Sequence, residues 1–312
     1  MKKKNAFILA CLASLSQVIY PQVDKFNAYV VQIPKENINN KVAIAIKDNI
    51  DLIGFPTTAG SLAMLDNYPI QNAFIVSKLQ ENNFYIDGKT NLSEWANFRS
   101  EKSVSGWSSY GGQTLNPFGA NLNPCGSSSG SAVAVASGLV DVAVGTETNG
   151  SISCPASVNG IVGHKPTVGL LSRGGIVPIS GTLDTPGPMT KSVIDNAILL
   201  SALSGTDPKD LASKNNPTDK NYLVGLEEAS LEGIRFGVNK NYLEDSIYKA
   251  TIVKIVEMGG IAIEFQPAEM NFDGFVTLLN ADMKKDLPSY LKIYASDQIS
   301  FNSMDEIVAF NA

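Results

Sequence analysis

Short apolar runs alternate with stretches of helical spacing along most of this chain. Residues 42–46, VAIAI, form a continuous run rich in β-branched side chains, which is typical of a buried strand. Residues 62–80 place apolar side chains at helical spacing instead, and residues 84–86, FYI, indicate a second short strand. Strands that alternate with helices in this way are typical of an α/β sheet with helices on its faces.

The alternation continues to the end of the chain. We expect a turn leading into a helix at 91–95, a helix at 130–139, a strand at 140–144, a helix at 192–203 capped by Thr190 or Ser192, a polar surface segment at 207–221, a strand at 233–238, a helix at 246–258, a strand at 261–265 and a capped helix at 303–310. Residues 99–126 are rich in Gly, Ser, Asn and Pro. A loop of that length inside a compact domain is usually functional.

Composition restricts the class of protein. The chain has 312 residues, of which 44% are hydrophobic and 17% are charged, so it has enough apolar material for one large domain or two. Its net charge of −6 leaves no positive surplus to neutralise phosphates, which argues against direct nucleic-acid binding. Since no apolar run is long enough to cross a bilayer, we expect no membrane partner. Nothing in the sequence indicates the oligomeric state.

The cysteines and the single histidine limit the metal and redox chemistry. Cys11, Cys125 and Cys154 are too few for a disulfide framework, and no paired Cys/His spacing suggests zinc. His164 is the only histidine, and it follows an apolar pair, which is more typical of a structural position than of a catalytic one.

The N-terminal segment has the form of a secretory signal. A basic start at residues 2–4 precedes an apolar stretch at 6–15, and small residues follow. The alternatives are an ordinary N-terminal helix and a lipoprotein signal ending at Cys11. We therefore expect a signal segment over residues 1–16 and a single domain over 17–312, located in the periplasm or secreted. Without a signal, the chain would be cytoplasmic.

Two glycine- and serine-rich turns, at residues 126–131 and 145–153, flank an apolar run. Because glycine accepts positive φ, such turns can aim several backbone N–H groups at one point. A serine there can face a substrate while nearby N–H groups act as an oxyanion hole. Ser127 and Ser151 are the candidates. The alternative is that the turns are polar loops or helix caps.

A serine nucleophile requires a base. Lys47 ends the most apolar predicted strand, and burial lowers the pKa of a lysine, so that a neutral amine becomes available near neutral pH. The alternative is that Lys47 reaches the surface or pairs with Asp48. Ser127 could relay the proton between lysine and nucleophile, because a hydroxyl both accepts and donates. The adjacent Ser128 and Ser129 could do the same.

The motifs of this region resemble those of the amidase signature family. The matching segments are AIKDNI at 45–50, GKTN at 88–91, CGSSSGSA at 125–132, GTETNGSISCPAS at 145–157, GHKPTVG at 163–169 and DTPGPM at 184–189. The resemblance extends over residues 41 to 310 and is greatest to the bacterial peptide-amidase-like branch.

The resemblance implies a mixed, mostly parallel sheet covered by helices on both faces. It implies that Ser151 is the acylating nucleophile, that Ser127, after Gly126 in a cis peptide, is the bridging serine, and that Lys47 is the base. The backbone N–H groups expected to form the oxyanion hole are those of Thr148, Asn149, Gly150 and Ser151. Water would hydrolyse the acyl-enzyme, and no metal or organic cofactor is implied.

The chain departs from the family pattern at several positions. His164 replaces an apolar residue, Asn149 stands where Gly or Asp is frequent, and Cys154 is interpreted as part of the wall of the site. The family usually continues beyond the predicted helix at 303–310, so we expect the C-terminal part to be missing.

The favoured hypothesis is a serine amidohydrolase that splits a small-molecule or peptide carboxamide into an acid and ammonia or an amine. One alternative is the glutaminase subunit of a tRNA-dependent amidotransferase. A second alternative is a truncated, non-catalytic remnant of an amidase.

Overall fold

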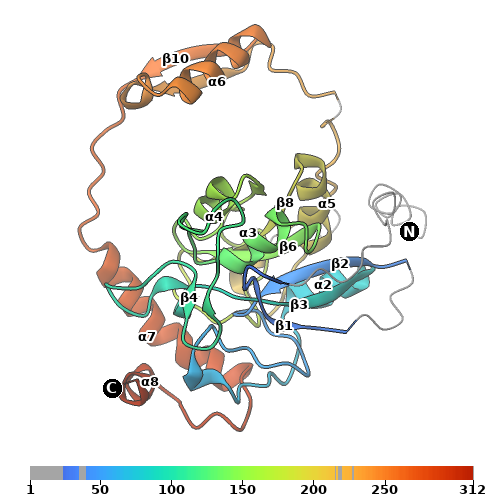
Figure 1. Ribbon diagram of the computed structural model, residues 1–312, viewed down its shortest axis with the longest axis vertical. Coiled ribbons are helices and arrows are strands. Elements are labelled where there is room, and N and C mark those ends of the chain that lie inside the picture. The colour runs from blue at the N-terminus through green and yellow to red at the C-terminus, as the bar shows by residue number, and fades with distance from the viewer. Residues whose placement is uncertain (1–23, 35–39, 215, 217–219, 227, 312) are drawn as a thin grey trace. The chain divides into compact units, whose positions relative to one another are not determined.

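A mixed six-stranded sheet is the centre of the larger of two units in this chain (Figure 1). The computed structural model describes residues 24–34, 40–214, 216, 220–226 and 228–311. The larger unit comprises Met1–Tyr222 and Thr277–Ala312, and the smaller comprises Leu223–Val276. The expected signal segment, residues 1–16, lies outside the described residues.

The strands of this sheet run partly parallel and partly antiparallel. In sheet order they are β1 (Tyr29–Gln32), β3 (Phe84–Thr90), β2 (Val42–Lys47), β6 (Val142–Glu147), β8 (Thr185–Thr190) and β7 (Val162–Gly163). β2 pairs in parallel with β3 and β6, whereas β1, β8 and β7 join by antiparallel pairing. The sheet is therefore mixed, as expected, but its parallel part is confined to the three central strands.

Helices cover both faces of the sheet. They are α2 (Phe74–Glu81), α3 (Ser129–Ala136), α4 (Ser153–Val158) and α5 (Val193–Leu203). Ala45 and Ala143 are partners on β2 and β6, and both belong to the core cluster that contains Val133 and Ala134 of α3. Side chains alternate between the faces of a strand, so Lys47 points to the α3 face with Ala45. On the other face, α5 contacts β8 and α2.

Most of the expected elements are present, but the helix expected at 62–80 needs correction. The helix predicted at 62–80 is instead a 3₁₀ turn, η2 (Leu62–Met64), followed by α2 from Phe74. Pro69 lies between them, and a proline disfavours helical geometry at the residue before it. No strand was predicted at β8, which contains Pro186 and Pro188. A proline lacks the N–H that an inner strand normally donates.

The loop region before α3 has little regular structure. Its elements are η3 (Glu94–Asn97), β4 (Trp107–Ser108) and β5 (Gly112–Gln113), so the helix expected after 91–95 is only a 3₁₀ turn. Residues 207–221, expected at the surface, include η4 (Leu211–Ser213) and the buried Asp210, which pairs with Arg173 at 2.7 Å.

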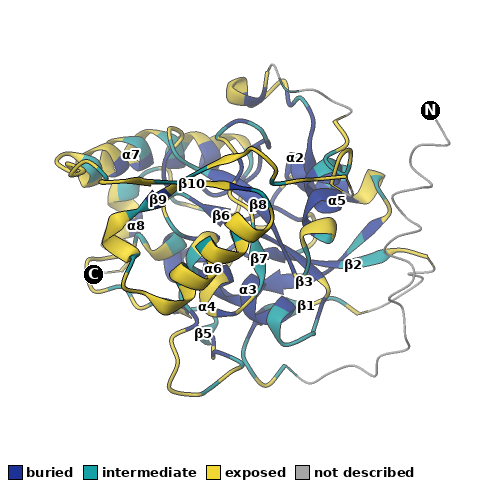
Figure 2. Ribbon diagram, turned by 90° about the horizontal axis from the view of Figure 1, so that it is seen from above, coloured by how far each residue is buried: buried dark blue, intermediate teal, exposed yellow. Residues whose placement is uncertain are grey.

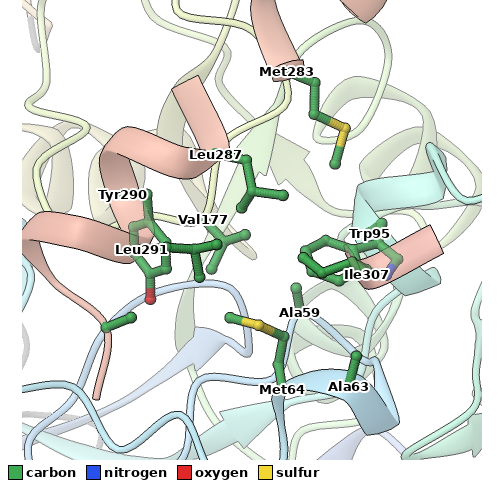
Figure 3. Packing of buried hydrophobic residues seen from close by; sticks show 11 residues of the cluster. Ala59, Ala63, Met64, Trp95, Val177, Met283, Leu287, Tyr290, Leu291 and Ile307 are labelled. Carbon is green, nitrogen blue, oxygen red and sulfur yellow. The ribbon is translucent and has the colours of Figure 1, made fainter. Parts of the chain in front are cut away.

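Two C-terminal helices pack on the larger unit (Figure 3). α7 (Phe275–Ile293) contributes Leu287 and Tyr290 to a cluster with Met64 and Trp95. The Tyr290 hydroxyl donates to Asp51 Oδ1 at 2.7 Å, which ties α7 to the residues that follow β2. α8 (Met304–Phe310) follows the N-cap Ser303, as expected of a capped helix, and Ser303 and Glu306 form a capping box.

The smaller unit is a parallel strand pair with one helix. Its elements are β9 (Arg235–Asn239), η5 (Lys240–Tyr242), α6 (Ser246–Glu257) and β10 (Ile261–Phe265). α6 has no buried residue and is mostly exposed in Figure 2. Within the residues described by the structure, no helix is both long enough and apolar enough to cross a bilayer.

Candidate active site

Lys47 is fully buried at the carboxyl end of the central strand β2. Its Nζ lies 2.7 Å from Ser127 Oγ, 2.9 Å from Thr146 Oγ1 and 3.2 Å from Thr146 O. Burial lowers the Lys47 pKa to about 7, although the charges of Asp184 and Glu147 act in the opposite direction. A substantial fraction of this amine is therefore neutral near neutral pH.

A neutral Lys47 is suitably placed to act as a base. Its two N–H groups can donate to the two Thr146 oxygens, and its lone pair is then left for the Ser127 hydroxyl. Asn49 Nδ2 also donates to Thr146 Oγ1, at 3.0 Å. Thr146 thus fixes the direction in which the amine points. Sequence reasoning missed this role, although Thr146 lies inside the GTETNGSISCPAS motif.

Ser127 is held by a cis peptide bond and by its surroundings. The Gly126–Ser127 bond is cis, as the resemblance implied. A Cβ at position 126 would collide with Ser93 Oγ, so this approach requires glycine. The Ser127 carbonyl accepts from Ser93 N at 3.1 Å, and its side chain is fully buried. The hydroxyl is consequently fixed next to Lys47.

Ser151 lies in the turn between β6 and α4 and is 7% exposed. Gly150 before it has φ +86°, a conformation that favours glycine. Ser128 N donates to Ser151 O at 3.1 Å, which places the nucleophile candidate beside the bridging segment. In the part of the chain that is described, no direct hydrogen bond joins the hydroxyls of Ser127 and Ser151.

The Glu147 carboxylate organises the turn that carries Ser151. Its Oε2 accepts from Ile152 N at 2.7 Å and from Ser153 N at 2.8 Å. Burial opposes ionisation, but hydrogen bonds from the N–H groups of Ser153, Ile152 and Gly150 hold the Glu147 pKa below its ordinary value. Glu147 was also missed from the sequence; its signal was an acidic residue within a glycine-rich turn.

One of the four N–H groups expected to form the oxyanion hole, that of Gly150, already has a side-chain partner. The Gly150 N–H interacts with the Glu147 carboxylate, whereas the backbone hydrogen bonds of the described residues include no donor from Thr148, Asn149 or Ser151. The Thr148 hydroxyl donates to the half-buried Asp184. Asp184 Oδ2 in turn accepts from Ile179 N and Ser180 N, both at 2.8 Å.

Asp48, the residue after Lys47, belongs to a fully buried charge pair. Lys89 Nζ is 3.0 Å from Asp48 Oδ1, and both side chains are fully buried. Lys89 also donates to Thr57 Oγ1 at 3.0 Å, and the Thr58 hydroxyl donates to Asp48. Asp48 therefore pairs with Lys89 and not with Lys47, so the Lys47–Asp48 pair considered from the sequence does not form.

The structure corrects the interpretation of the cysteines. Cys125 and Cys154 form a disulfide with a Cα–Cα distance of 6.0 Å. Three cysteines were considered too few for a disulfide framework, and Cys154 was interpreted only as part of the wall, but this bond joins the segment before Ser127 to the helix after Ser151. It links two turns that are separated in sequence, so only the fold brings the sulfurs together.

His164 plays no visible part in this cluster. It is exposed, and its backbone N–H donates to Pro188 O at 3.1 Å. Across the described ranges, its ring has no hydrogen bond to any of the serines. The geometry thus favours Lys47 over His164 as the base.

Comparisons with known proteins identify relatives of this chain. The Amidase family model matches residues 22–259. A protein of Arabidopsis thaliana named a probable amidase is 39% identical, over 87% of this chain and 53% of its own length. The crystal structure of the native peptide amidase from Stenotrophomonas maltophilia is 35% identical, with a TM-score of 0.84 over 98% of this chain and 68% of that one.

Another set of relatives has a different name. A glutamyl-tRNA(Gln) amidotransferase subunit from Lactiplantibacillus plantarum is 43% identical, over 69% of this chain and 43% of its own length. The chain spans about half the length of the curated relatives it matches. Because the family model covers most of the chain and its fold matches that of peptide amidase, the chain belongs to the amidase (amidase signature) family.

Proposed function

We propose that this chain carries the catalytic site of a serine amidohydrolase, which cleaves the C–N bond of a carboxamide. The observation that carries the proposal is the contact between the buried Lys47 amine and the Ser127 hydroxyl. A lysine with a pKa near 7 is an effective general base at neutral pH.

In the proposed mechanism, neutral Lys47 takes a proton from Ser127, and Ser127 takes one from Ser151 as Ser151 attacks the amide carbon. Backbone N–H groups of Thr148, Asn149 and Ser151 stabilise the tetrahedral oxyanion, because the fourth expected donor, Gly150 N–H, already interacts with the Glu147 carboxylate. The proton then returns through Ser127 to the leaving nitrogen. Water, activated by the same relay, hydrolyses the ester on Ser151 and regenerates the hydroxyl.

We propose peptide amides and small carboxamides as the substrates. The similarity to a peptide amidase over nearly the whole chain supports the first class. A second candidate is the glutaminase component of an amidotransferase, because relatives named as glutamyl-tRNA(Gln) amidotransferase subunits share up to 43% identity. The remaining alternative is a non-catalytic remnant.

The test combines covalent labelling with a substrate screen. A fluorophosphonate probe should label Ser151, and Ser151→Ala should abolish both the label and amide hydrolysis. Ser157→Ala, an exposed serine on α4, is the matched control and should keep both. The screen includes C-terminal peptide amides, simple carboxamides and glutamine. Release of ammonia from glutamine alone would favour the glutaminase, and absence of both label and hydrolysis would favour the remnant.

A further inference from the structure

The Cys125–Cys154 disulfide spans the two turns of the candidate site. Cys125 lies two residues before Ser127, and Cys154 lies three residues after Ser151. Among the described residues, neither serine hydroxyl forms a hydrogen bond with the sulfurs. The bond therefore acts on the relative position of the two backbones and not on the chemistry of the hydroxyls.

The other ties between these two segments are hydrogen bonds and the apolar packing of Ala132 with Ile152 and Ala156. Ser128 N donates to Ser151 O at 3.1 Å, and Asn159 Nδ2 bridges Pro124 O at 2.9 Å and Pro155 O at 2.8 Å. A protein hydrogen bond contributes only about 0.5–1.5 kcal/mol net, because water competes for its partners. The disulfide is the one covalent tie among the connections that the described residues make between these segments.

The disulfide is also accessible to solvent. Cys125 and Cys154 are both partly exposed, whereas Ser127, Ser128 and Ser129 are buried beneath them. Cys125 itself has φ +55°, and its carbonyl accepts from Ser129 Oγ at 2.6 Å. Access controls thiol–disulfide exchange, so the partial exposure of both residues favours attack by a thiol from solution.

We propose that the Cys125–Cys154 disulfide positions the active site and can be reduced by thiols. The intact bond holds Ser127 in register with Ser151, and its reduction slows amide hydrolysis. This inference rests on the proposed function. The reductant is a low-molecular-weight thiol, such as reduced glutathione. Two thiol molecules supply two electrons and two protons, the sulfur–sulfur bond breaks, each cysteine becomes a thiol, and the two reductant molecules become one disulfide.

Reduction of the disulfide should change both the Lys47 pKa and the rate of hydrolysis. When the segment before Ser127 moves away from α4, water reaches Lys47, and the loss of desolvation raises its pKa toward the ordinary value. The acid limb of the pH–rate profile then moves to higher pH. A misplaced relay also lowers kcat, by about 10- to 100-fold, while KM changes little.

The experiment compares the oxidised chain, the same chain after glutathione treatment, and the double variant Cys125→Ala/Cys154→Ala. Cys11→Ala is the control for the remaining cysteine. Differential alkylation with mass spectrometry counts the free thiols. Hydrogen exchange of peptides spanning 123–129 measures how readily this loop opens, and the measurement does not require an active enzyme.

We expect one disulfide in the untreated protein, lower kcat and faster exchange at 123–129 after reduction, and recovery with oxidised glutathione. The double variant should resemble the reduced protein and ignore thiols. Free Cys125 and Cys154 in untreated protein, or unchanged exchange and kcat on reduction, would overturn the inference while leaving the amidase proposal intact. Absence of hydrolysis by the oxidised chain would instead overturn the proposed function. In that case, hydrogen exchange at 123–129 that does not change on reduction would still rule out the positioning role of the disulfide.

Discussion

Lys47 and Ser127 are 80 residues apart in sequence, yet Lys47 Nζ lies 2.7 Å from Ser127 Oγ, and both side chains are fully buried. The contact forms because β2 ends beside the loop that leads into α3. Burial removes water from the ammonium group, so the neutral amine is stabilised without any catalytic histidine.

Amide hydrolysis should depend on pH through Lys47. Below a pH of about 7 the amine is protonated and cannot accept the serine proton, so kcat/KM should rise with pH through this region. A pH–rate profile measured from pH 5 to 9 tests this. Lys47→Met should abolish hydrolysis at every pH. A profile that stays flat across this range would contradict a lysine base.

The same titration should appear in the unfolding free energy. The Lys47 pKa is about 7 in the folded chain and near its ordinary value of 10.5 when unfolded, so the unfolded state binds more protons between these values. Stability contributed through Lys47 should therefore rise with pH across that window, by up to about 1.4 kcal/mol per pH unit. Denaturation of the chain and of Lys47→Met at pH 7 and pH 9 gives the difference. If the unfolding free energies of the two proteins depend equally on pH, the Lys47 pKa is not lowered in the folded chain.

Thr146→Val should impair catalysis through the orientation of the amine. The substitution keeps the shape of the side chain but removes the hydroxyl that accepts from Lys47 Nζ at 2.9 Å and from Asn49 Nδ2 at 3.0 Å. Misplacement of a catalytic group can cost up to about 100-fold in rate, so we expect kcat to fall with little change in KM. Thr146→Ser retains the hydroxyl and should keep most of the activity. Equal kcat values in the two variants would rule out this role.

Glu147→Ala should disorganise the turn that carries Ser151. The carboxylate accepts from Ile152 N and Ser153 N, and its loss leaves two N–H groups at the start of α4 without that partner. We expect slower fluorophosphonate labelling of Ser151, by about 10- to 100-fold. Glu147→Gln keeps an acceptor oxygen and should label faster than the alanine variant. Equally slow labelling of both variants would indicate that the negative charge, and not the acceptor oxygen, organises the turn.

Lys89→Met should destabilise the fold strongly. It leaves the buried Asp48 carboxylate without the cation now 3.0 Å away, and removal of one partner of a buried pair typically costs about 3–5 kcal/mol. The double variant Asp48→Leu/Lys89→Met removes both charges and should lose less. Chemical denaturation of the three proteins measures the difference. If the double variant is the least stable, the pair itself contributes net stability.

The sequence predicted the local elements best where one physical signal dominates. The apolar run at 42–46 became β2, and Ser192 caps α5 through a hydrogen bond from Asp195 N. It failed at β8, whose two prolines argue against an inner strand but are accommodated between β6 and β7. It also failed at 62–80, where apolar spacing continues across Pro69 although the only α-helix there begins after it, at Phe74.

By itself, the sequence determined the α/β class, the family and the positions expected to hold the site, because these depend on local periodicity and on contiguous motifs. Only the tertiary structure decided which distant groups meet. It placed Ser127 against Lys47, assigned Lys89 to Asp48, and brought Cys125 to Cys154. Those pairings follow from strand order and from the burial of each polar group, and neither property is encoded in the spacing of residues along the chain.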